Sequence, residues 1–123
     1  MVHILILEFG SQTTDRIGTR LQSMGVPVKY GPSNINVDEV YSADGVIISG
    51  GPKGAKDPDA YPFSPLLFAT PVPILGICYG HQVMAHMLGG KVVKGRHREF
   101  GREILHLKNQ EGIFRGLSLK EIV

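Results

Sequence analysis

An apolar run in the middle of the chain reads Val72-Pro73-Ile74-Leu75-Gly76-Ile77-Cys78-Tyr79-Gly80-His81-Gln82. It ends at a cysteine with glycine two residues before and two residues after it, which predicts a nucleophile elbow: a buried strand turns sharply into a helix, with the nucleophile in a strained backbone conformation at the turn. A side chain at Gly76 or Gly80 would crowd that turn. The dipole of the following helix would point at the Cys78 sulfur and favour the thiolate. The alternative is a buried cysteine that packs as a small hydrophobic residue.

Apolar segments that alternate with helical patterns predict an α/β fold with a mostly parallel sheet flanked by helices. The expected strands are residues 2–7, 26–30, 45–49 and 73–77, and the expected helices are a segment closed by Gly25, residues 38–41, residues 66–69 and the helix after Cys78, which ends at Gly89-Gly90. Ligands bind such sheets where the strands end in loops. Cys78 and the glycines after residue 49 both fall at such ends.

Length and composition favour one ordinary domain spanning residues 1–123. The chain has 42% hydrophobic and 20% charged residues with a net charge of +2, which argues against disorder. We find no basic leader with a cleavage site and no apolar stretch of membrane-spanning length, so we expect a cytoplasmic protein. A single cysteine cannot form an internal disulfide, and no cluster has metal-ligand spacing, so we expect no metal.

A glycine-rich turn, Gly50-Gly51-Pro52, follows the expected strand at 45–49, as Cys78 follows another. If the two strands are neighbours, this backbone lies beside the thiolate. Thiolate attack on an amide carbonyl places negative charge on oxygen, and backbone N–H groups of Gly51 and Tyr79 are the obvious donors. The pair is therefore a candidate oxyanion hole, although Gly-Gly-Pro alone is also a common turn sequence.

Four segments together resemble a known family: Glu8-Phe9-Gly10-Ser11-Gln12, Ser49-Gly50-Gly51-Pro52, Gly76-Ile77-Cys78-Tyr79-Gly80-His81-Gln82 and Arg98-Glu99-Phe100-Gly101. The chain resembles class I (triad-type) glutamine amidotransferases, and most closely the subfamily formed by the amidotransferase domains of GMP synthetases. The resemblance implies that Cys78 forms a glutamyl thioester. It also implies that Gly51 and Tyr79 supply oxyanion-hole amides, and that Gly50 and Gln82 help to hold glutamine.

The same resemblance implies a partner. The ammonia released from glutamine would pass to an ATP-dependent synthetase domain or subunit that aminates XMP to GMP, with ATP and Mg expected there and no cofactor in this domain. The resemblance implies neither a nucleic acid nor a membrane as partner.

The sequence departs from the family in its catalytic base. The family uses a histidine in a His-Pro-Glu segment, preceded by a Ser-His-Gly-Asp stretch, and neither occurs among these 123 residues. We expect the chain alone to hydrolyse glutamine poorly, because the base must protonate the leaving ammonia. His81 is the nearest substitute in sequence, but the elbow projects Cys78 away from its helix. A sheet that stops inside the fold would leave apolar surface and an unpaired edge.

A basic stretch contains Lys91, Lys94, Arg96, His97, Arg98 and Arg102. We interpret it as a solvated loop or partner surface rather than a nucleic-acid site, because aromatic residues do not interleave the charges apart from Phe100. Two other readings of the whole chain stay open at this point. One is a non-catalytic amidotransferase-like binding or regulatory subunit, and the other is a cysteine-elbow protein of the PfpI/DJ-1 type.

Overall fold

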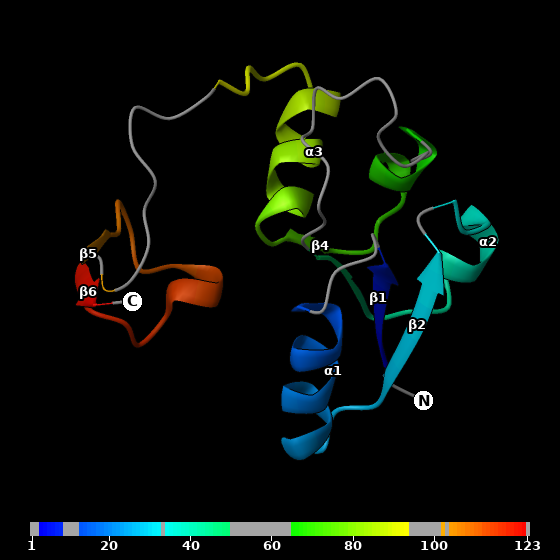
Figure 1. Ribbon diagram of the computed structural model, residues 1–123, viewed down its shortest axis with the longest axis horizontal. Helices are drawn as coiled ribbons and strands as arrows, with labels where there is room; N and C mark the ends of the chain where they lie inside the picture. Colours follow the sequence, from blue (N-terminus) through cyan, green and yellow to red (C-terminus); the bar gives the residue numbers. More distant parts are fainter. Residues whose placement is uncertain are drawn as a thin grey trace. The chain divides into compact units, whose positions relative to one another are not determined.

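The computed structural model describes residues 3–8, 13–32, 34–49, 65–93, 102 and 104–122. Two compact units divide the chain, Met1–Val92 and Val93–Val123 (Figure 1). A compact unit is not by itself a domain, so the expectation of a single domain over residues 1–123 stays a prediction. The predicted turn at Gly50-Gly51-Pro52 lies outside the described residues.

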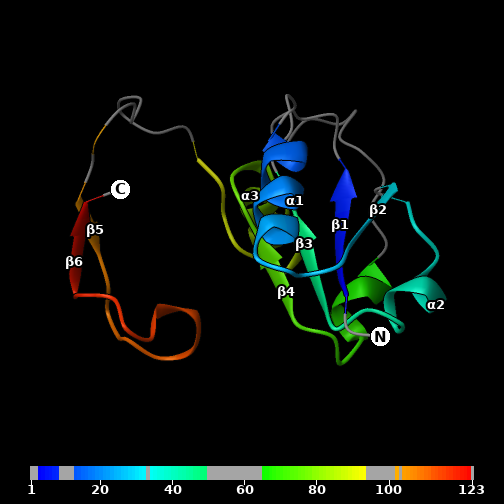
Figure 2. The same cartoon turned by 90° about the horizontal axis from the view of Figure 1, so that it is seen from below.

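The first unit holds a four-stranded sheet in the order β2-β1-β3-β4 (Figure 2). Its strands are β1 (Ile4–Glu8), β2 (Val28–Pro32), β3 (Gly45–Ile48) and β4 (Ile74–Gly76). Every pairing is parallel, with Ile4 opposite both Val28 and Gly45, and Val46 opposite Ile74. The predicted parallel α/β architecture is therefore confirmed.

Helical segments lie between these strands or, in the case of α3, follow the last of them. They are α1 (Thr13–Ser23), α2 (Val37–Val40), the 3-10 helix η1 (Pro65–Ala69) and α3 (Tyr79–Met87). The predicted stop at Gly25 is confirmed, since this glycine has φ +82 just beyond α1. Asn36 caps α2 by accepting a 3.0 Å hydrogen bond from the Asp38 backbone N–H.

The sheet divides the apolar residues of the first unit between two faces. Leu5, Leu7, Val46 and Ile48 share one face with Val40, Ala43, Leu67 and Val83, which come from or follow α2, η1 and α3. Ile6, fully buried, points to the opposite face, because side chains alternate along a strand. Tyr30 lies opposite Ile6 in the register and reaches α1, where its hydroxyl is the atom nearest to a Cβ built on Gly18. The strand β1 is thus covered on both faces, as its uninterrupted apolar run predicts.

Part of the α1 face is open. Leu75 lies opposite Ile47 in the register and is 39% exposed. Within the described ranges, β4 pairs only with β3, so its other edge has no ladder partner. Both features agree with the expected apolar surface and unpaired edge.

The second unit is a small antiparallel pair. Strand β5 (Ile104–His106) pairs with β6 (Lys120–Ile122), and the 3-10 helix η2 (Gly112–Phe114) lies in the connection. Leu107 extends the ladder by donating its backbone N–H to the Leu119 carbonyl at 2.7 Å. Large apolar side chains of this unit stay exposed, Ile113 most of all at 72%. No described helix, in either unit, has the length and apolar character needed to cross a membrane.

Candidate active site

Cys78 stands at the turn between β4 and α3. It is the N-cap of α3, two residues after β4 ends at Gly76, and its side chain is exposed. Its backbone has φ 54 and ψ −117, the positive φ that glycine normally takes at the first central position of a type II′ turn. Among the described residues it is the one non-glycine with positive φ. The predicted strained strand-to-helix turn is confirmed, and the alternative of a buried cysteine is wrong.

The two glycines that flank the cysteine are required by space. A Cβ on Gly80 would lie 2.0 Å from the Ile48 carbonyl oxygen, and a Cβ on Gly76 would lie 2.9 Å from both the backbone N and the Cα of His81. Contacts this short with backbone atoms do not occur in folded proteins. The prediction that a side chain at either position would crowd the turn is therefore confirmed.

Backbone hydrogen bonds hold the elbow against β3. Ile77 donates its N–H to the Ile48 carbonyl at 2.9 Å, and Gly80 donates to the Ile77 carbonyl at 3.0 Å. Gln82 donates its backbone N–H to the Cys78 carbonyl at 3.2 Å, which starts the regular helix. The cysteine thus sits on a backbone tied to the strand whose continuation carries Gly50 and Gly51.

Three of the predicted site residues, Cys78, Tyr79 and Gln82, lie together at the start of α3. Tyr79 is the first residue of this helix, so its backbone N–H is one of the donors that a helix leaves without an internal acceptor. Gln82 is exposed one turn further on. Gly50 and Gly51 lie outside the described residues. The oxyanion-hole and substrate-binding roles of these residues stay predictions.

The carboxyl ends of β1 and β3 are where the chain changes direction in the sheet. From β1 the chain goes outward to β2 and then returns to the other side of β1 as β3. Ligands of open parallel sheets bind beside such a switch point. Cys78 follows β4, which is paired to β3, so the candidate nucleophile lies at the same edge.

A buried hydroxyl pair at this edge has no signal in the sequence. Thr14 Oγ1 and Ser49 Oγ lie 2.5 Å apart in a hydrogen bond, and the two residues are 2% and 0% exposed. Thr14 belongs to the first turn of α1 and Ser49 directly follows β3. Ser49 belongs to a quoted motif, but nothing in a sequence pairs it with a threonine 35 residues earlier.

In the first unit, none of the described histidines is shown in contact with Cys78. His81 and His86 are exposed on α3. His3 is buried, and its backbone N–H donates to Asp44 Oδ2 at 2.9 Å. Within the same ranges, no group of three or more His, Cys, Asp or Glu side chains is arranged to hold a metal ion.

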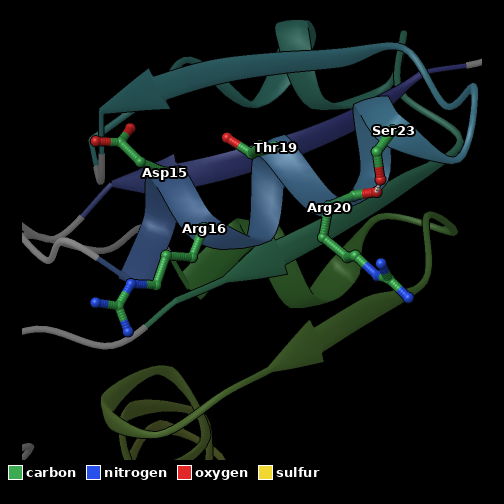
Figure 3. A pocket seen from close by; sticks show the side chains of 5 residues that line it. All are labelled: Asp15, Arg16, Thr19, Arg20 and Ser23. Atoms are coloured by element: carbon green, nitrogen blue, oxygen red, sulfur yellow. Dashed lines mark hydrogen bonds between the residues drawn. The ribbon is translucent and has the colours of Figure 1, made fainter.

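An open hollow of about 450 Å³ lies elsewhere, on the surface of α1 (Figure 3). Its lining residues, Asp15, Arg16, Thr19, Arg20 and Ser23, all come from this one helix. The Ser23 hydroxyl donates to the Arg20 carbonyl at 2.6 Å and so is occupied by the helix itself. No predicted catalytic residue lines this hollow.

The fold and the elbow define the class of protein. Residues 5–123 match the model of the family described as glutamine amidotransferase class-I, and the chain belongs to this family.

Relatives narrow the comparison to one enzyme. The chain is 43% identical over 122 residues to the glutamine-hydrolyzing GMP synthase of Geobacillus kaustophilus and 39% identical to that of Campylobacter lari. Each match covers 98% of this chain but 24% of the relative, so the chain spans about a quarter of the length of these curated relatives. Among solved structures, a putative GMP synthase subunit from Thermoplasma acidophilum superposes with a TM-score of 0.83 at 32% identity, over 100% of this chain and 63% of that one.

Proposed function

We propose that this chain is the glutamine-hydrolysing part of a GMP synthase. The observation that carries the proposal is the exposed Cys78 at positive φ on a strand-to-helix turn, in a chain of the class-I amidotransferase family. GMP synthases are named among its relatives over almost the whole of this chain.

The chemistry follows from the thiol. The Cys78 thiolate adds to the side-chain amide carbon of glutamine and forms a tetrahedral intermediate with negative charge on the former carbonyl oxygen. The Tyr79 N–H, with that of Gly51, stabilises this oxyanion. The amide nitrogen of this intermediate takes up a proton, the carbonyl re-forms as the C–N bond breaks, ammonia leaves, and a glutamyl thioester remains on Cys78. Water hydrolyses the thioester to glutamate and frees the thiol.

The ammonia would serve a synthetase domain or subunit that uses ATP and Mg to aminate XMP. This step is proposed from the names of the relatives, of whose length this chain spans about a quarter. A cytoplasmic location belongs to the same proposal.

The mechanism also needs a proton donor for the leaving ammonia, and the histidine that supplies it in the family is not matched among these residues. No proline follows Pro73, so no His-Pro-Glu segment occurs after Cys78. His97-Arg98-Glu99 places a histidine two residues before a glutamate, and it lies outside the described residues. We expect the 123-residue chain alone to hydrolyse glutamine about 10²- to 10⁴-fold more slowly than a complete triad enzyme.

The test is active-site labelling. A diazoketone analogue of glutamine should alkylate Cys78 in the purified chain, and added glutamine should slow the reaction, while Cys78→Ala removes the label. Intact mass and peptide mapping identify the modified residue. Labelling that glutamine does not slow would contradict the proposal and favour a cysteine-elbow protein with another substrate. Enzyme-like turnover by the chain alone would contradict the expected lack of a base, and His97→Ala and His81→Ala variants would then identify one.

A further inference from the structure

Ile48, the last residue of β3, supports the elbow with both its backbone and its side chain. Its carbonyl oxygen accepts the 2.9 Å hydrogen bond from the Ile77 N–H. A Cβ built on Gly80 would collide with the same oxygen and would lie 2.8 Å from the γ2 methyl carbon of Ile48. Gly80 therefore packs directly against the carbonyl and one methyl group of this residue.

These contacts lie on either side of the thiol in the sequence. Ile77 directly precedes Cys78, and Gly80 follows it by two residues. The Gly80 N–H donates to the Ile77 carbonyl at 3.0 Å, so these residues form a closed turn with both ends on Ile48. Between the two ends lie Cys78, with its exposed thiol, and Tyr79, whose backbone N–H the helix leaves without an internal acceptor.

Ile48 is fixed more firmly than the turn that rests on it. Its side chain is fully buried in the core cluster that also contains Leu7, Val46 and Val83. Its strand is paired on both sides, with Leu7 of β1 and Gly76 of β4 opposite Ile48 in the register. Close-packed interiors pass strain on to their neighbours, and the first turn of α3 is exposed on its outer side. A change in the shape of the Ile48 side chain should therefore displace this turn.

We propose that Ile48 is a positioning residue for Cys78: its γ2 methyl group, together with its carbonyl, sets the height of the thiol and of the Tyr79 N–H above the sheet. The inference rests on the proposed glutamine hydrolysis. Attack on an amide carbon requires the reacting atoms about 3–3.5 Å apart, and a misplacement of about 1 Å can cost about a hundredfold in rate. A displaced turn would therefore slow the chemical step and leave the thiol exposed.

The experiment uses the natural protein in which this chain occurs and compares substitutions of Ile48 that remove or keep the γ2 methyl group. Ile48→Leu keeps the volume of the side chain but lacks this methyl group. We expect kcat for glutamine hydrolysis to fall about ten- to a hundredfold, with KM changed less than about threefold. Ile48→Met also lacks the γ2 methyl group and has a more adaptable side chain, so it should show the same loss even where Ile48→Leu folds poorly.

Ile48→Val is the variant expected to rescue activity. Valine keeps both γ carbons and loses only the δ methyl group. The small cavity should lower Tm, but kcat should stay within about threefold of wild type, because the contact with Gly80 is kept.

Ile6→Leu is the matched control. Ile6 is as fully buried as Ile48, in the neighbouring strand β1, but it points to the face of the sheet opposite the core cluster that includes Val83 of α3. The same exchange of side chains at this position should lower Tm and leave kcat unchanged. The rate at which a simple haloacetamide alkylates Cys78 should stay within about threefold of wild type in every variant, because the thiol remains exposed.

The outcomes separate the two proposals. Wild-type protein that hydrolyses no glutamine would overturn the proposed function and the positioning role with it. Active wild-type protein whose Ile48→Leu and Ile48→Met variants keep kcat would overturn the positioning role alone, and so would an equal loss of kcat in Ile48→Val or Ile6→Leu. A fall in haloacetamide labelling parallel to kcat would also overturn it, because the elbow would then be disrupted rather than displaced.

Discussion

The backbone conformation at position 78 should cost cysteine more conformational free energy than it would cost glycine. With φ 54 and ψ −117 it occupies a region that glycine enters freely and other residues enter at a cost of about 1–3 kcal/mol. Glycine in place of alanine ordinarily destabilises a folded chain by about 0.5–1 kcal/mol, because it has more freedom to lose. The difference predicts that Cys78→Gly is more stable than Cys78→Ala by about 1 kcal/mol.

The assay is urea or thermal unfolding of the two variants side by side. Both lack the thiol and both leave an exposed position, so their difference reports the backbone. For a unit of this size, about 1 kcal/mol corresponds to a shift in Tm of about 4–8 °C. Ala85→Gly, inside the same helix, is the matched control and should lower stability by about 1 kcal/mol.

The reasoning would be refuted if glycine were less stable than alanine at position 78 as well as at position 85. If Cys78→Gly is less stable than Cys78→Ala by as much as Ala85→Gly falls below wild type, the elbow stores no strain. The positive φ of Cys78 would then cost no free energy that the packing of β3 and α3 would have to offset.

Other substitutions test the packing around the elbow and the core. Gly80→Ala should lower the free energy of unfolding by more than about 2 kcal/mol and abolish labelling of Cys78, because the new Cβ meets the Ile48 backbone. Gly18→Ala should cost less than about 1 kcal/mol, because its new Cβ meets the movable end of the 40% exposed Tyr30 side chain. Equal losses of the two variants in urea unfolding would contradict this expectation. Leu67→Ala should lose about 2–5 kcal/mol at a site 3% exposed, and Leu88→Ala, 62% exposed, about 0.5 kcal/mol or less, with similar midpoints counting against the assigned core.

The elbow could be read from the sequence because its signals are local. Gly76, Cys78 and Gly80 lie within one stretch of five residues, and all three belong to the same strand-to-helix turn. The strands were located by apolar runs, but their ends were not. The strand expected at residues 26–30 is Val28–Pro32, because Ile4 pairs with Val28 and its N–H bonds the Pro27 carbonyl at 2.9 Å. A proline can end this strand because β2 is at the edge of the sheet.

What the sequence could not show are contacts between distant segments. Nothing in the order of residues pairs Thr14 with Ser49, and a polar residue after an apolar strand is ordinarily taken as the start of a loop. Neither β5 nor β6 is among the strands expected from the sequence. Strand β5 is three residues long and exposed throughout, so it carries no burial pattern to detect. Register is specified weakly where neither face is buried.

The requirement for glycine at position 80 shows how the two kinds of information meet. The glycine can be recognised in the sequence as part of a motif, but the reason for it is a distant contact. The first turn of α3 packs at Gly80 against the Ile48 carbonyl, and the same carbonyl accepts the hydrogen bond from the Ile77 N–H. Ile48 is itself fully buried between its strand neighbours and the helices. The position of the Cys78 thiol is therefore set by the core of the sheet, and substitutions that disturb β3 should reach the chemistry without touching the cysteine.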